Sequence, residues 1–99
     1  MAYRIEFLTG ARRDFKHLPE EVKKTFGPVI NDLAENPRPK GVEKITGISD
    51  CFRIRHGEYR VVYTIEDDLL LVLVLRLGHR REVYDHIVAT VRQRLRGRR

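Results

Sequence analysis

Three arginines in the middle of the chain lie at positions that place them on one face of a predicted β-sheet. Arg53 and Arg55 alternate with apolar residues in one run, and Arg60 follows in a second alternating run. If Gly57–Glu58 is a two-residue hairpin loop, Arg55 lies opposite Arg60, and like charges so placed destabilise a sheet. Either this face is solvated and its side chains splay apart, or it binds an anion such as phosphate through paired hydrogen bonds. The pattern alone leaves both interpretations open.

His79 and Tyr84 could supply the acid–base chemistry that arginine lacks. Arginine stays protonated at any working pH, so it binds phosphate and stabilises developing negative charge but does not shuttle protons. Cleavage of RNA through its own 2′-hydroxyl needs one group to remove that proton and another to protonate the leaving oxygen. His79 and Tyr84 flank Arg80 and Arg81 and have suitable side chains. Each also has an ordinary structural explanation, as a polar residue after a glycine and as an amphipathic aromatic at a helix start.

Several other chemistries have no basis in the sequence. The four histidines and the single Cys51 lack the close spacing of metal ligands, so we expect neither a metal nor a cofactor. The chain has no glycine-rich phosphate loop, and its carboxylates are too scattered for a paired-acid mechanism. Cys51 is better explained as a small buried residue than as a nucleophile. One cysteine cannot form an internal disulfide, which fits a reducing cytosol.

Length and charge bound the possible functions. The chain of 99 residues predicts a single domain over 1–99, and 41% hydrophobic with 34% charged residues indicates a globular protein. A net charge of +6 favours an acidic partner, either nucleic acid or protein. The N-terminus has no apolar signal region, and the apolar run 69–75 is too short to span a membrane. We therefore expect a soluble, cytoplasmic protein with no membrane partner.

A few strands and helices must position these residues. Alternating apolar residues predict strands, and apolar residues spaced by three and four predict helices. The resulting order, β-α-α-β-β-β-α, indicates an α+β domain. We expect a mostly antiparallel four-stranded sheet, two N-terminal helices packed on one face, and a C-terminal amphipathic helix. The predicted segments are strands 2–8, 51–56, 59–66 and 69–77, helices 10–18 and 19–35, a loop at 37–50, and a helix with a basic tail at 82–99.

Three local features refine this scheme. Thr9 is a suitable N-cap for the first helix. Pro28 should kink or break the second helix, because proline removes a hydrogen bond and clashes with the preceding turn. The run 69–77 is apolar almost throughout, which predicts a strand covered on both faces.

Several short sequence runs, taken with this order of elements, resemble those of a known protein family. They are Lys44-Ile-Thr-Gly, Cys51-Phe-Arg-Ile-Arg, Glu58-Tyr-Arg-Val-Val-Tyr and, after an acidic turn and an apolar strand, Gly78-His-Arg-Arg-Glu-Val-Tyr. Together they resemble the RelE/ParE superfamily of bacterial and archaeal toxins, over essentially the whole chain. The Tyr-Arg-Val-Val-Tyr strand and the Gly-His-Arg-Arg-Glu-Val-Tyr ending are the most specific parts of the likeness.

The resemblance implies a toxin of a type II toxin–antitoxin pair that enters the ribosomal A site, beside 16S rRNA, and cuts mRNA without a metal. The 2′-hydroxyl attacks the adjacent phosphate. By position, Arg53 and Arg55 match basic residues that hold the RNA, and Arg60 matches the arginine that stabilises the transition state. Arg80 matches an arginine near the leaving group, and Tyr84 a tyrosine that orients the base or assists the attack. Further RNA-binding candidates are Lys44, Arg81, Arg12 and Arg13.

The chain departs from RelE in two respects. RelE has lysines where this chain has Arg53 and Arg55, and arginine cannot act as a base, so that role would pass to His79 or Tyr84. The segment between Gly78 and Tyr84 is also shorter, so the leaving-group arginine is either Arg80 or Arg81.

Two other functions compete with RNA cleavage. The ParE branch shares the fold but inhibits DNA gyrase, and a third interpretation is a basic RNA-binding module without catalysis. Retention of the arginine set and Tyr84 favours RelE. A cognate acidic antitoxin is expected as the partner, because a basic domain with an amphipathic terminal helix suits a partner with acids and an apolar face. In the family the antitoxin often displaces the terminal helix, so we expect 82–99 to be the most mobile segment without it.

Overall fold

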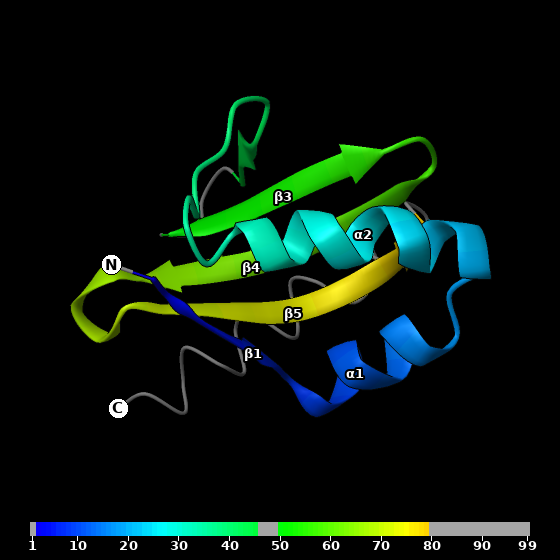
Figure 1. The fold of residues 1–99 in the computed structure, drawn as a ribbon, viewed down its shortest axis with the longest axis horizontal. Coiled ribbons are helices and arrows are strands. Elements are labelled where there is room, and N and C mark those ends of the chain that lie inside the picture. The colour runs from blue at the N-terminus through cyan, green and yellow to red at the C-terminus, as the bar shows by residue number, and fades with distance from the viewer. Residues whose placement is uncertain (1, 46–49, 80–99) are drawn as a thin grey trace.

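The computed structural model describes residues 2–45 and 50–79, which form a twisted sheet with two helices (Figure 1). The elements are β1 Arg4–Phe7, α1 Thr9–Lys16, α2 Glu20–Asp32, β2 Glu43–Lys44, β3 Cys51–His56, β4 Tyr59–Glu66, a 3-10 turn Asp67–Leu69 and β5 Leu71–His79. The α+β class is confirmed. The predicted helix at the C-terminus lies outside the described residues.

The sheet has five strands in the order β1-β5-β4-β3-β2, rather than the four expected. β1 runs parallel to β5, and the other pairs are antiparallel, so the prediction of a mostly antiparallel sheet is confirmed. The additional strand is β2, which lies in the segment expected to be a loop. It is two residues long, too short to show the alternation by which a strand is recognised in sequence.

The hairpin register agrees with the sequence prediction. Phe52 pairs with Tyr63, Ile54 with Val61, and Arg55 with Arg60, around the two-residue turn Gly57–Glu58. Gly57 has φ +61°, in the left-handed region that glycine occupies without steric cost. One face of the sheet therefore carries the apolar partners, and the other carries the arginines.

α2 crosses the apolar face of the sheet, which we call the helix face (Figure 1). α1 packs next to β5 and β1. The core on this face joins the two helices to β4 and β5. Its buried members are Ala11, Leu18, Phe26, Ile30, Leu33, Phe52, Val61, Tyr63, Ile65, Val72, Val74 and Leu77. The buried residues of α2, Phe26 and Ile30, are four positions apart, which agrees with the helical spacing of apolar residues that predicts this helix.

The opposite side of the sheet has a smaller core of its own. Leu73 and Leu75 of β5 alternate with the helix-face residues and pack with Val62 and Cys51. Leu75 and Cys51 have no exposed surface. β5 is therefore buried on both faces, as its continuous apolar sequence predicts.

The helix boundaries differ locally from expectation. α1 begins at Thr9 itself, after Leu8 in extended conformation, and no side chain caps it, so the Thr9 cap prediction is wrong. α2 continues through Pro28 without a break. Pro28 and Lys24 are both exposed, so water can reach the Lys24 carbonyl that loses its usual donor. No helix in the described part of the chain is long and apolar enough to cross a membrane.

Candidate active site

The arginine face is the side of β3 and β4 that carries Arg53, Arg55 and Arg60. The Arg55–Arg60 pair is confirmed, and Arg53 pairs with Val62. Their exposure differs sharply: the Arg55 side chain is 57% exposed and that of Arg53 is 24% exposed, while Arg60 as a residue is only 7% exposed. These positions place two accessible guanidinium groups beside a buried one, an arrangement suited to an anion that enters from solvent.

Glu43 of β2 relieves part of the repulsion on this face. Its Oε1 atom accepts a hydrogen bond from Arg53 Nε at 3.2 Å and lies 3.1 Å from Arg55 Nε. β2 pairs Glu43 directly with Arg53, which fixes the carboxylate between the two side chains. Sequence reasoning missed Glu43, because only the register of a two-residue strand brings it there. Glu43 therefore offsets part of the positive charge of Arg53 and Arg55.

Arg60 occupies its buried position because of the strand beside it. In β5 its partner is Gly78, which has no side chain, so the long arginine side chain meets no Cβ group at that point. Burying a permanent cation costs free energy unless polar or charged groups surround it. Arg60 is therefore held among such groups, at the point where the arginine face meets β5.

His79 does not share the face of Arg60. It pairs with Tyr59, and their rings meet edge to face with centroids 5.7 Å apart. Tyr59 packs against the helix-face core, so His79 lies on that side at the end of β5. Its Nε2 atom is 3.8 Å from Glu58 Oε2. The structure thus separates His79 from the arginines with which the sequence grouped it, because neighbouring strand residues point to opposite faces.

The remaining predicted site residues are dispersed. Lys44 is exposed on β2 and pairs with Phe52, so it lies on the helix-face side of the edge strand. Arg12 and Arg13 are exposed on α1. The structure gathers none of these three onto the arginine face. Arg80, Arg81 and Tyr84 lie outside the described residues.

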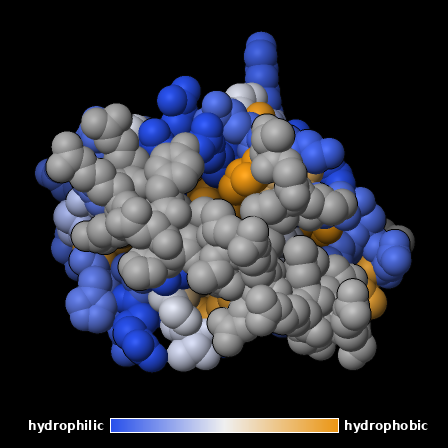
Figure 2. Space-filling view, turned by 180° about the vertical axis from the view of Figure 1, so that it is seen from behind, coloured by the Kyte–Doolittle hydropathy of each residue, from blue (hydrophilic) through white to orange (hydrophobic). Residues whose placement is uncertain are grey.

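Figure 2 views the molecule from the side opposite to that of Figure 1. Hydrophilic side chains lie around the margin of this side, and hydrophobic ones are visible towards its middle.

Cys51 belongs to the core of this side, and its burial raises the pKa of the thiol to about 11. A thiol with such a pKa is protonated at neutral pH, so Cys51 is not a nucleophile. Among residues 2–45 and 50–79, no cluster of His, Cys, Asp and Glu could hold a metal ion.

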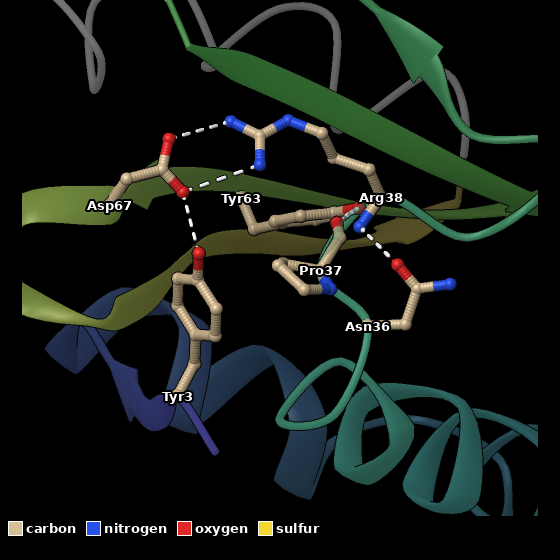
Figure 3. Close-up of polar contacts among 6 residues, drawn as sticks. All are labelled: Tyr3, Asn36, Pro37, Arg38, Tyr63 and Asp67. Atoms are coloured by element: carbon tan, nitrogen blue, oxygen red, sulfur yellow. Dashed lines mark hydrogen bonds and ion pairs between the residues drawn. The ribbon is translucent and has the colours of Figure 1, made fainter. Parts of the chain in front are cut away.

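A hydrogen-bond network just after the end of β4 joins three segments that are far apart in sequence (Figure 3). Asp67, after β4, accepts hydrogen bonds from Arg38 Nη2 at 2.9 Å and from the Tyr3 hydroxyl at 2.7 Å. Arg38 also lies over the Phe52 ring, 5.6 Å from its centroid. The hydrogen bond from Arg38, and then that from Tyr3, hold the pKa of Asp67 below its usual value.

The same segment is held from the sheet side as well. The buried Tyr63 hydroxyl donates to the Pro37 carbonyl at 2.8 Å, and the Arg38 amide donates to Asn36 Oδ1 at 3.2 Å (Figure 3). Burial raises the pKa of Tyr63, so its hydroxyl remains a donor throughout the physiological range. These contacts fix residues 36–38, the start of the segment that carries Glu43 to the arginines.

Comparison with known proteins covers most of the chain. A family model described as the ParE toxin of type II toxin–antitoxin system, parDE, matches residues 5–84. The toxin RelG of Mycobacterium tuberculosis is 35% identical over 85 residues, which cover 85% of this chain and 98% of that protein. The chain belongs to the RelE/ParE toxin superfamily. The resemblance found in the sequence is thereby confirmed.

Other members of the superfamily agree with this assignment. The mRNA interferase toxin RelE of Escherichia coli is 30% identical over 95 residues, covering 92% of this chain and 99% of that protein. The solved structure of a mutant of Escherichia coli RelE in the free state matches with a TM-score of 0.78 and 25% identity, over 95% of this chain and 98% of that one. A chain of the intact Escherichia coli RelBE toxin–antitoxin complex matches with a TM-score of 0.72 and 28% identity, over 79% and 96%.

Proposed function

We propose that this toxin is an endoribonuclease that cuts mRNA in the ribosomal A site without a metal ion. The arginine face carries the proposal, because the buried Arg60 lies opposite the exposed Arg55, with the partly buried Arg53 on the same face, and clustered guanidinium groups suit a phosphate. Likeness to a relative named as an mRNA interferase supports the same activity. The substrate contacts would be mRNA on this face and ribosomal RNA around it, in the cytoplasm.

The proposed reaction is a transfer within the RNA backbone. The 2′-oxygen attacks the adjacent phosphorus, its proton is removed, and the 5′-oxygen leaves with a proton, giving a cyclic phosphate and a free 5′-hydroxyl. Arg53 and Arg55 would hold the backbone, and Arg60 would stabilise the charge that develops on the phosphate oxygens. Because arginine does not exchange protons, Tyr84 and His79 remain the candidates for proton transfer, and Arg80 or Arg81 for the leaving group. His79 is the weaker candidate, since it lies on the other face.

An acidic antitoxin is the proposed protein partner. Solved RelB–RelE complexes, including the one from Escherichia coli, contain toxin chains that match this fold. The net charge of +6 suits an acidic partner, which would also screen the arginine face from RNA. DNA gyrase inhibition is the second candidate function, because the matching family model is described by the ParE toxin.

Induction in cells with primer extension on an abundant translated mRNA tests the proposal. We expect cuts within codons for the wild type and their loss for Arg60→Ala. Arg55→Gln should reduce cutting by about tenfold or more, the effect of one charge-assisted contact to the transition state. Because the Arg55 side chain is 57% exposed, this variant should fold normally and controls for a loss of folding in Arg60→Ala.

Lys24→Ala, which removes an exposed cation on α2, is the matched control and should leave the cuts unchanged. Growth arrest with intact mRNA and accumulated gyrase–DNA breaks would select the ParE function instead. If protein that is shown to be folded and free of antitoxin causes neither growth arrest nor cuts, only the interpretation as a non-catalytic RNA-binding module is left.

A further inference from the structure

A cavity of about 450 Å³ lies between the end of α1, the start of β4 and the end of β5. Its polar lining comes from Arg13 and His17 on one side and from Tyr59 and His79 on the other, above an apolar floor that includes Leu18 and Leu77. The volume falls within the range of sites that bind small ligands. Its wall includes His79, the weaker candidate for proton transfer, and Arg13, which the sequence suggests as an RNA-binding residue and which does not lie on the arginine face.

Asp14 also lines the cavity, but its charge is already engaged. Its Oδ2 atom accepts hydrogen bonds from Arg76 Nε at 2.7 Å and from the Leu77 amide at 3.1 Å. Its Oδ1 atom accepts a third, from Arg76 Nη2 at 3.1 Å. The carboxylate therefore fixes α1 against β5 instead of repelling an anion. Arg13, which is exposed, leaves the cavity with a cationic side.

The aromatic rings of the cavity are held in defined orientations. His17 Nδ1 lies 2.8 Å from the Arg13 carbonyl oxygen. Because a carbonyl only accepts, Nδ1 must carry the proton, and Nε2 is the ring atom left to meet a ligand. The Tyr59 and His79 rings stand almost perpendicular, at 82°, and form the second side. Rings on both sides of an apolar floor, with a guanidinium beside them, are the features by which proteins hold a nucleotide.

We propose that this cavity binds the nucleotide next to the scissile phosphate of the RNA substrate. Tyr59 pairs with His79, and the next residues, Arg60 and Gly78, pair on the arginine face. Gly78, the strand partner of Arg60, also lines the cavity, so the cavity adjoins the position of Arg60 at this end of the sheet. A single strand bound by a phosphate on the arginine face can pass around the start of β4 and the end of β5, which brings its neighbouring nucleotide to the cavity. The base packs against the rings, Arg13 contacts the phosphate of this nucleotide, and His17 Nε2 accepts a hydrogen bond from a ribose hydroxyl. This inference rests on RNA being the substrate, as proposed above.

Direct binding to the isolated chain tests the cavity without any cleavage. Adenosine, cytidine, guanosine and uridine 5′-monophosphates are titrated while the ring signals of His17 and Tyr59 are followed by NMR. We expect saturable shifts of both residues, with affinity reduced about tenfold in Arg13→Gln and in His17→Ala. Lys16→Gln removes the adjacent exposed cation, which does not line the cavity, and should change the affinity less than twofold.

Three results would overturn the proposal. Equal weakening by Arg13→Gln and Lys16→Gln would show general charge attraction to α1. Inorganic phosphate that shifts the same signals with the same affinity would show an anion site with no place for a base. An acidic peptide that saturates these signals where the nucleotides do not would assign the cavity to a protein partner. Thermal unfolding of each variant confirms that it is folded before its affinity is compared.

The binding test and the cleavage test can fail separately. If the nucleotides bind but mRNA stays intact in cells, the proposal of a nucleotide-binding cavity stands and the proposed ribonuclease function is wrong. Codon-specific cuts without nucleotide binding would retain the function and remove the cavity. If both hold, His17→Ala should raise the RNA concentration needed for half-maximal cleavage more than it lowers the maximal rate, because the cavity binds substrate away from the reacting atoms.

Discussion

Glu43 shows how one carboxylate can hold two cations in place without cancelling the site. It lies between Arg53 and Arg55, within 3.2 Å of both Nε atoms, while Arg60 remains buried beside them. The sequence is compatible with two explanations for the clustered arginines, a solvated face or an anion site. The structure adds partial internal pairing through Glu43, which lowers the repulsion between Arg53 and Arg55.

Neutralising Glu43 should therefore strengthen nonspecific RNA binding. For Glu43→Gln we expect tighter binding of single-stranded RNA, and a salt dependence steeper by about 0.7 in log K against log salt for each added phosphate contact. The loss of stability should be below about 1 kcal/mol, because these ion pairs are partly solvated. Fluorescence anisotropy at several salt concentrations measures the first effect and urea unfolding the second. Weaker binding would mean that Glu43 mainly orients the arginines.

At the level of elements, Asp14 joins α1 to the central strand. Its three hydrogen bonds to Arg76 and the Leu77 amide cross from α1 to β5, and its side chain is 17% exposed. Breaking a partly buried pair leaves a charged partner without its acceptor and costs more than the pair itself contributes. α1 therefore depends on a single polar side chain as well as on its apolar contacts, Ala11 and Phe15.

Asp14→Asn should lower the free energy of unfolding by about 2–4 kcal/mol. Urea denaturation measures this effect, with Asp32→Asn at an exposed position of α2 as the matched control. The control should change stability by less than about 0.5 kcal/mol. Equal effects of the two substitutions would show that the Arg76 pair contributes little, and that apolar packing alone holds α1.

The network around Asp67 ties β1, the segment before β2 and the turn before β5 together, and its stability depends on pH. Because the folded-state pKa of Asp67 is lowered, its contribution is fully present above the unfolded value of about 3.9. That contribution disappears as pH falls through the lower folded value. The hydrogen bond to Asp67 also raises the pKa of Tyr3. Tyr3 therefore contributes to folding stability below its unfolded pKa of about 10, and this contribution is lost as pH rises through the higher folded value.

Asp67→Asn should consequently make stability less dependent on pH on the acid side. Chemical unfolding between about pH 2 and 5 is compared for the wild type, Asp67→Asn and Asp68→Asn. Asp68 is the adjacent, exposed carboxylate and should retain the wild-type slope when replaced. If both variants lose the same slope, general charge repulsion at low pH governs the transition in place of this network.

At the scale of the whole molecule, the sequence predicts what depends on local periodicity. The β3–β4 register, the two-sided burial of β5 and the buried stripe of α2 all follow from alternation or helical spacing. Features that depend on contacts between distant segments were missed. β2 is too short for a pattern, and the partners Asp14–Arg76 and Tyr3–Asp67 lie far apart in sequence. The face on which His79 lies can be assigned only from its strand partner, Tyr59.

Topology also sets when the molecule can become active. β1 is the first strand to be synthesised, yet it pairs with β5, joining Arg4 to Leu71, which closes a long loop. Arg60 likewise waits for its β5 partner Gly78. Nonlocal pairings of this kind form late in folding. The proposed phosphate site at Arg60 therefore assembles only after β5, near the end of the described residues, has been synthesised and has paired.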